Sequence, residues 1–211
     1  MPLYKTITEG SHVKILIWKV EETEDQLREG IALTENSVNR LKSMKSEIHR
    51  KGYLSIRHLF ATVGLVDHDL YYDEAGKPHL TNGKYISITH SHEFTGIIVS
   101  DNVEVGVDIE MQREKILRIA SKYTPLEEYK TVANYDALIR KLTIVWGAKE
   151  SLYKIYSQHG LSFLHHIDIT DFSLSDDSET KGNILYKGKS SEYTIKFLEF
   201  EGFTCVYAIK I

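Results

Sequence analysis

Residues 85–110 decide the fold, and they read YISITHSHEFTGIIVSDNVEVGVDIE. Alternating apolar and polar residues predict three strands, separated by a polar break and by a tight turn at Asp101-Asn102. The predicted strands span residues 85–89, 96–100 and 103–109. Because successive side chains of a strand point to opposite faces, Asp108 and Glu110 are expected to share one face of the last strand.

The chain on either side of this stretch alternates helical and strand-like patterns. A strand is predicted over residues 12–20, a helical block over 23–60 and a long helix over 136–156. A capping-box pattern begins at Thr124, and the tail from His165 onward reads as strands that end in a hairpin. This order predicts an α+β fold with two similar α+β halves, residues 1–102 and 103–211.

Composition excludes several classes of protein. The chain has 211 residues, a formal net charge of −4 and a pI near 6.2, and nucleic-acid-binding domains are usually strongly basic. One cysteine, Cys205, allows no disulfide within the chain, which fits a reducing compartment. No signal peptide and no stretch long enough to span a bilayer is evident. We therefore expect a cytoplasmic protein with neither a nucleic-acid nor a membrane partner.

Asp108 and Glu110 are the first candidate site residues. Two carboxylates on one strand face offer the hard oxygen ligands that Mg²⁺ prefers, and Mg²⁺ usually completes its shell with waters and substrate phosphates. The alternative is a solvated polar face, which is common in antiparallel sheets. The pair alone does not decide between the two.

The segment WGAKESLYK, residues 146–154, supplies the second group. Trp146, Glu150 and Lys154 recur every four residues and so lie along one side of a helix. Glu150 is a candidate third metal ligand or general base, and Lys154 a candidate partner for phosphate charge. An ordinary exposed Glu–Lys pair would have the same spacing. Lys149 falls on the apolar stripe, so it either reaches to the edge of the core or points at an anion.

Weaker candidates lie elsewhere in the chain. Lys77, in a rigid Gly-Lys-Pro loop, and His90, at a predicted strand end, could both donate to phosphate oxygens. A basic run that includes Arg50 is either a solvated helix face or a receiver of an acidic partner or a phosphate. Adjacent His165 and His166 are expected on opposite faces of a strand, which argues against joint metal ligation.

Four motifs follow one another in a recognisable order. They are Gly76-Lys77-Pro78, the segment ISITHS at 86–91, the segment GVDIE at 106–110, and WGAKESLYK at 146–154. This set resembles the 4'-phosphopantetheinyl transferases, and the chain length resembles their surfactin-type branch. Members of that branch fold two similar α+β halves in one chain, an intramolecular pseudo-dimer. The resemblance covers about residues 40 to 165.

The resemblance implies an enzyme that moves 4'-phosphopantetheine from coenzyme A to a serine of an apo acyl or peptidyl carrier protein and releases 3',5'-ADP. It implies that Asp108, Glu110 and Glu150 hold Mg²⁺ against the pyrophosphate. Glu150 would also accept the serine proton, and Lys154 would stabilise the charge on the leaving phosphate. The implied coenzyme A contacts are Arg50, Lys77, Thr89, His90 and Lys149.

Further expectations concern the location of the site and the alternatives to this function. The metal ligands come from a strand and from a later helix, so we expect the site between the two halves, in a chain that is a monomer. One alternative is a non-catalytic module of the same fold that binds coenzyme A or a carrier protein. Another is a metal-dependent phosphohydrolase that cleaves a pyrophosphate with water. Intact Asp108, Glu110, Glu150 and Lys154 argue against the module, and the lack of a further acidic cluster argues against the hydrolase.

Overall fold

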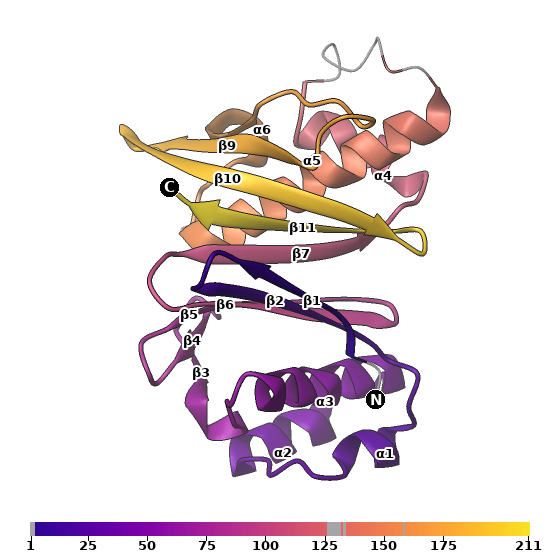
Figure 1. Cartoon of the computed structure of the whole chain (residues 1–211), viewed down its shortest axis with the longest axis vertical. Coiled ribbons are helices and arrows are strands. Elements are labelled where there is room, and N and C mark those ends of the chain that lie inside the picture. Colours follow the sequence, from indigo (N-terminus) through magenta and orange to yellow (C-terminus); the bar gives the residue numbers. More distant parts are fainter. Residues whose placement is uncertain (1–2, 126–131, 133, 158) are drawn as a thin grey trace. The chain divides into compact units, whose positions relative to one another are not determined.

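A computed structural model describes residues 3–125, 132, 134–157 and 159–211. The chain divides into two compact units, Met1–Asn102 and Val103–Ile211, coloured from indigo to yellow along the chain in Figure 1. Helix accounts for 33% of the structure and strand for 36%, which confirms the predicted α+β class. Within the described residues, no helix has the length and apolar character required to cross a membrane.

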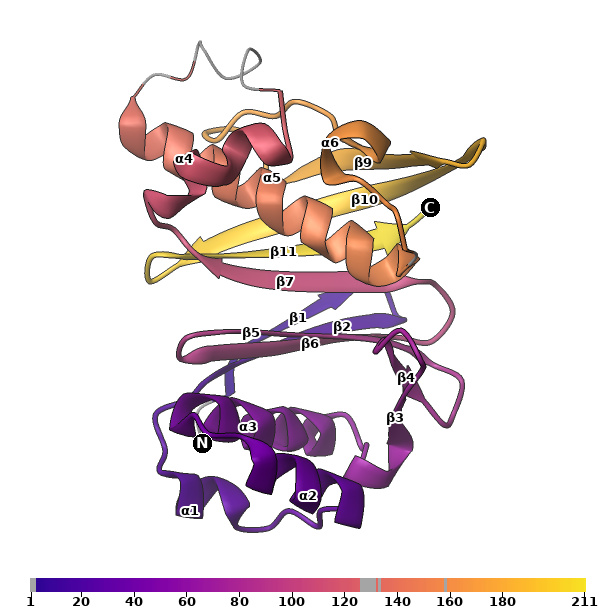
Figure 2. The same ribbon diagram turned by 180° about the vertical axis from the view of Figure 1, so that it is seen from behind.

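Unit 1 is an antiparallel four-stranded sheet with helices on one face (Figures 1 and 2). Its elements are β1 (Leu3–Glu9), β2 (Val13–Lys19), α1 (Glu24–Arg28), α2 (Glu35–Ser43), α3 (Glu47–Thr62), η1 (Asp67–Asp69), β3 (Leu70–Tyr72), β4 (Pro78–Leu80), β5 (Tyr85–Ser91) and β6 (Phe94–Ser100). The sheet order is β1-β2-β6-β5, and β3 and β4 form a separate hairpin. Leu16, Leu54, Phe60 and Ile97 lie in the core between sheet and helices.

The helical block predicted over residues 23–60 is three helices. Thr23 and Thr34 each cap a new helix, because their side-chain oxygens accept the backbone N–H groups of Gln26 and Ser37. Gly30, with φ of 73°, lies between the first two helices in a conformation that glycine adopts readily. The amphipathic pattern of the sequence continues across the breaks between the helices, so the pattern alone did not predict where one helix ends and the next begins.

Unit 2 is a five-stranded antiparallel sheet crossed by one long helix (Figure 2). Its elements are β7 (Val105–Met111), α4 (Lys115–Ile119), η2 (Ala120–Lys122), α5 (Tyr135–Tyr156), α6 (Phe163–His166), β8 (Ile167–Ile169), β9 (Glu179–Tyr186), β10 (Lys189–Phe200) and β11 (Phe203–Lys210). The sheet order is β7-β11-β10-β9-β8. The capping-box pattern at Thr124 extends into residues 126–131, outside the described residues.

Several predicted boundaries in this unit are confirmed. Helix α5 begins at Tyr135 and ends at Tyr156, within a residue of the predicted range. Glu201 and Gly202 both have positive φ, 47° and 76°, as a two-residue hairpin turn requires. His165 and His166, however, end the short helix α6 and do not lie on a strand.

The two units share a pattern of strand connections. In each, the strand that precedes the main helices pairs antiparallel with the last strand of the unit: β2 with β6, and β7 with β11. The penultimate strand, β5 or β10, then flanks that last strand on its other side. This correspondence supports the description of two similar α+β halves, while their packing as a pseudo-dimer stays a prediction.

Candidate functional site

Strand β7 carries the two carboxylates predicted from the sequence, and helix α5 covers them. Asp108 is 6% exposed and lies directly opposite Val206 of β11. Gly106 has the same orientation as Asp108, and a Cβ atom there would lie 2.0 Å from the carbonyl oxygen of Ser151 on α5. The helix therefore lies too close to β7 for any side chain at Gly106. The alternative of a solvated strand face does not hold.

Helix α5 presents polar groups to this strand. Lys154 Nζ donates to Asp108 Oδ1 at 2.8 Å and to the carbonyl oxygen of Val107 at 2.8 Å. One helical turn earlier than Glu150, Trp146 Nε1 donates to Glu110 Oε1 at 3.3 Å. Both carboxylates of β7 thus face α5, as the alternation along the strand predicts.

The carboxylates of Asp108, Glu110 and Glu150 lie close enough to interact through their charges. Burial, followed by the charges of Asp108 and Glu110, raises the pKa of Glu150 to about 7, against the opposing effect of Lys154. Burial and the charge of Asp108 also raise the pKa of Glu110. The folded chain therefore gathers more negative charge here than Lys154 alone compensates.

The chemistry of these groups fits a divalent cation. All three offer carboxylate oxygens, and a cation among them would compensate the burial and the mutual repulsion that raise the pKa values of Glu110 and Glu150. In the part of the chain that the structure describes, no group of three or more His, Cys, Asp or Glu side chains is already arranged to hold a metal ion. Metal binding therefore stays a proposal here.

Residues 104–208 match the family model of the 4'-phosphopantetheinyl transferase superfamily. This segment includes β7 and α5, and with them the three carboxylates and Lys154. Unit 2 carries a domain of this superfamily. No curated protein matches the chain. The superfamily transfers phosphopantetheine, uses coenzyme A as substrate and typically requires a divalent metal.

Lys149 has a structural place in the transferase domain. It is 2% exposed, and its ammonium donates to the carbonyl oxygens of Tyr123, Phe163 and Ile167 at 2.6, 2.8 and 2.7 Å. An ammonium has three donors, so these carbonyls use all of them. The predicted coenzyme A contact is revised, because Lys149 ties α5 to three other segments of the domain.

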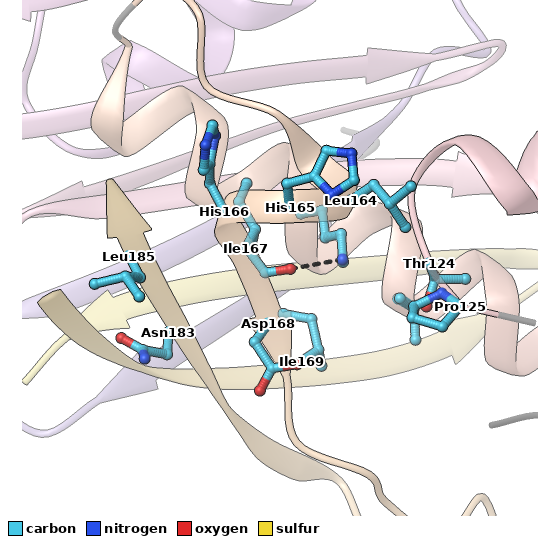
Figure 3. A pocket seen from close by; sticks show the side chains of 12 residues that line it. Thr124, Pro125, Leu164, His165, His166, Ile167, Asp168, Ile169, Asn183 and Leu185 are labelled. Atoms are coloured by element: carbon cyan, nitrogen blue, oxygen red, sulfur yellow. Dashed lines mark hydrogen bonds between the residues drawn. The ribbon is translucent and has the colours of Figure 1, made fainter. Parts of the chain in front are cut away.

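Figure 3 shows a cavity of about 260 Å³ in the transferase domain, beside this lysine. Its lining includes His165, His166, Asp168 and Asn183, and Figure 3 marks the bond to the carbonyl oxygen of Ile167. His166 Nδ1 already accepts the backbone N–H of Ser162 at 2.8 Å. The carboxylates of β7 do not line this cavity, so it is separate from the candidate site.

Unit 1 contains the other predicted contacts: Thr89 and His90 on β5, Lys77 directly before β4, and Arg50 on α3. Thr89 is 3% exposed, whereas His90 is exposed and meets the ring of His49 edge-on at a centroid distance of 5.9 Å. His90 opens into a cavity of about 290 Å³. The lining of that cavity includes Arg40, Met44, His49, Tyr53, Tyr72 and His90.

Arg40 was missed by the sequence analysis. Its guanidinium lies over the rings of Tyr72 and Tyr53, 5.0 and 5.8 Å from their centroids. Arg50, which the sequence favoured, points elsewhere: Nε donates to Glu24 at 2.7 Å, and Nη1 donates to the carbonyl oxygens of Met44 and Lys45. We therefore assign Arg50 to tethering α1, and Arg40 to the cavity wall.

Asp73 fixes the loop that carries Lys77. Its Oδ1 accepts the backbone N–H groups of Ala75 and Lys77, each at 2.9 Å, and its Oδ2 lies 2.9 Å from His79 Nε2. Gly76 turns the loop with φ of 82°. Only the aspartate three residues before the glycine could have signalled this device in the sequence.

Proposed function

We propose that the chain is a holo-[acyl-carrier-protein] synthase of the surfactin-type branch. It transfers 4'-phosphopantetheine from coenzyme A to a serine of an apo acyl or peptidyl carrier protein and releases 3',5'-ADP. The observation that carries the proposal is the group of three interacting carboxylates with Lys154, formed by β7 and α5 inside the segment that matches the superfamily.

Asp108, Glu110 and Glu150 would hold Mg²⁺. The ion would offset the negative charge of the pyrophosphate during phosphoryl transfer. Trp146 supports this arrangement from α5, because its indole N–H donates to Glu110 and limits the rotation of that carboxylate.

Glu150 and Lys154 would serve the two ends of the transfer. Glu150 would accept the proton of the carrier serine, because its carboxylate oxygens can act as a general base. Lys154, which is 28% exposed in its side chain, can shift a hydrogen bond from Asp108 to a phosphate oxygen. Such alignment and charge compensation are most of what phosphoryl transfer requires of a protein.

Unit 1 would bind the nucleotide half of coenzyme A. His90 and Arg40 border one cavity and can both donate to phosphate oxygens. Tyr53 and Tyr72 add aromatic faces to the same wall. Lys77, on the loop fixed by Asp73, and Thr89, beside His90 on β5, are proposed as further contacts. The cytoplasmic location and the monomeric state remain predictions.

Intact-mass spectrometry of apo carrier proteins tests this function. Incubation with the chain, coenzyme A and Mg²⁺ should add one phosphopantetheine to the carrier serine, and chelation should prevent it. Glu150→Gln should lose the activity, whereas the exposed Glu179→Gln is the matched control and should keep it. Release of free phosphopantetheine would instead identify a hydrolase. Binding of coenzyme A without product, across fatty-acid, polyketide and peptide carriers, would identify a non-catalytic module.

A further inference from the structure

Helix α5 contacts β11 through Gly147, a residue without a side chain. A Cβ atom at Gly147 would lie 2.8 Å from Val206 Cγ2 and 3.2 Å from Val206 Cβ. Carbon atoms in contact are normally about 3.5–4.0 Å apart, so a methyl group at Gly147 would require a shift of roughly 1 Å. Val206 is fully buried and β-branched, which leaves its side chain little freedom to turn away.

This contact lies beside the candidate site. Val206 pairs directly with Asp108 across β11 and β7, and the position of a Cβ at Gly147 is 3.8 Å from Asp108 Oδ2. Glu150 and Lys154 follow Gly147 by three and seven residues, so they share its face of α5. The depth of α5 at Gly147 therefore sets how closely Glu150 and Lys154 approach Asp108.

We propose that Gly147 is a positioning residue for the transferase site. The bare glycine lets α5 rest on Val206, and this spacing holds Glu150 and Lys154 against Asp108. Gly147 acts only through these side chains and touches no reacting atom. The inference rests on the proposed function for its catalytic consequence, but its structural part concerns cation binding by the carboxylates and can be measured without turnover.

Gly182 provides a matched control at the same helix–sheet interface. A Cβ atom at Gly182 of β9 would meet Leu152 Cδ1 of α5 at 2.9 Å and Ile195 Cγ1 of β10 at 3.1 Å. The distances resemble those at Gly147, but the neighbours at Gly182 are the outer atoms of leucine and isoleucine side chains and none of the carboxylates. A purely structural cost of adding a methyl group under α5 should therefore appear at both positions.

The experiment compares Gly147→Ala, Gly182→Ala, Val206→Ala and the Gly147→Ala/Val206→Ala double variant in the full chain. Mg²⁺ binding is measured by calorimetry, and kcat by the rate of carrier modification. We expect Gly147→Ala to weaken Mg²⁺ binding about tenfold and to lower kcat about 30-fold, since a misplacement of about 1 Å has effects of this order. Gly182→Ala should stay within about twofold of wild type in both. The double variant should return to within about threefold of Val206→Ala.

Three results would overturn the inference: wild-type Mg²⁺ binding and kcat in Gly147→Ala, an equal loss in Gly182→Ala, or a double variant no better than Gly147→Ala. If Gly147→Ala does not fold, the Val206→Ala background decides, because adding Gly147→Ala there must leave Mg²⁺ binding nearly unchanged. If the wild-type chain binds Mg²⁺ but modifies no carrier, the proposed function is wrong. The role of Gly147 is then decided by the Mg²⁺ binding of the variants alone.

Discussion

The ammonium of Lys154 lies 2.8 Å from Asp108 Oδ1 and 2.8 Å from the carbonyl oxygen of Val107. This one side chain fastens the last turns of α5 to the middle of β7. It also brings a positive charge to a group of interacting carboxylates that lies inside the segment matching the superfamily. The same contact therefore contributes to folding and, in the proposed reaction, to catalysis.

Removal of the Lys154 ammonium should reduce stability as well as activity. Lys154→Met leaves the buried Asp108 carboxylate without its charged donor, which should lower the free energy of unfolding by about 1–3 kcal/mol. Urea unfolding measures this cost. Lys196→Met is the control, because Lys196 pairs with the exposed Glu179 at 3.5 Å and such pairs contribute about 0–1 kcal/mol. Equal effects in the two variants would contradict the importance given to the Lys154 contact.

Stability in the absence of Mg²⁺ should fall as the pH rises toward neutrality. The pKa of Glu150 is about 7 in the folded chain and 4.5 ordinarily, so the folded state holds an extra proton between these values. By linkage, the free energy of unfolding falls from about pH 4.5 to pH 7 and then levels off, by at most about 3 kcal/mol. Urea titrations in chelator at pH 5 and 7.5 measure the fall.

Two changes should reduce that fall in stability. Glu150→Gln removes the titrating carboxylate, so the free energy of unfolding of this variant should vary less with pH across this range. Mg²⁺ favours the ionised carboxylates and should restore stability at pH 7.5 in the wild type. A wild-type curve that rises from pH 5 to 7.5 in chelator would contradict the electrostatic description of the site.

The buried ion pair of unit 1 should matter far more than its exposed pairs. Arg57 Nε lies 2.9 Å from Asp67 Oδ1, and their side chains are only 4% and 1% exposed. Arg57→Met would leave Asp67 as a buried, uncompensated charge and should destabilise the chain by about 3–5 kcal/mol. Lys84→Met, which breaks an exposed pair with Asp101, should cost less than about 1 kcal/mol, and urea unfolding of both variants measures the difference.

Arg40 should contribute to nucleotide binding. Its guanidinium lies over Tyr72 in the cavity that His90 also borders, so Arg40→Ala should weaken binding of 3',5'-ADP about tenfold, as loss of one charge-assisted contact does. Calorimetry provides the dissociation constants. Arg28→Ala is the matched control, because Arg28 is an exposed arginine of α1 paired with Glu24. Unchanged binding in Arg40→Ala would remove Arg40 from the proposed site.

Some of the candidate site could be predicted from short-range patterns. Alternation along β7 placed Asp108 and Glu110 on one face, and the four-residue period of α5 placed Trp146, Glu150 and Lys154 on one side. Both predictions depend only on the repeat of a strand or a helix. The position of Lys149 on α5 could be predicted in the same way. Its role could not, because that role depends on the carbonyl groups of Tyr123, Phe163 and Ile167, which no local pattern reveals.

The sequence by itself determined the strand β7 and the helix α5 and the types of polar groups that they carry, because hydrophobic periodicity is a local property. Only the tertiary structure decided which polar groups meet. It separated Arg40 from Arg50, because the one faces a cavity and the other is used by Glu24 and two carbonyls. It also explains why position 147 is a glycine, because α5 packs so closely on Val206 that a side chain there would clash. That distance arises from the packing of a helix on a sheet whose strands are distant in the chain.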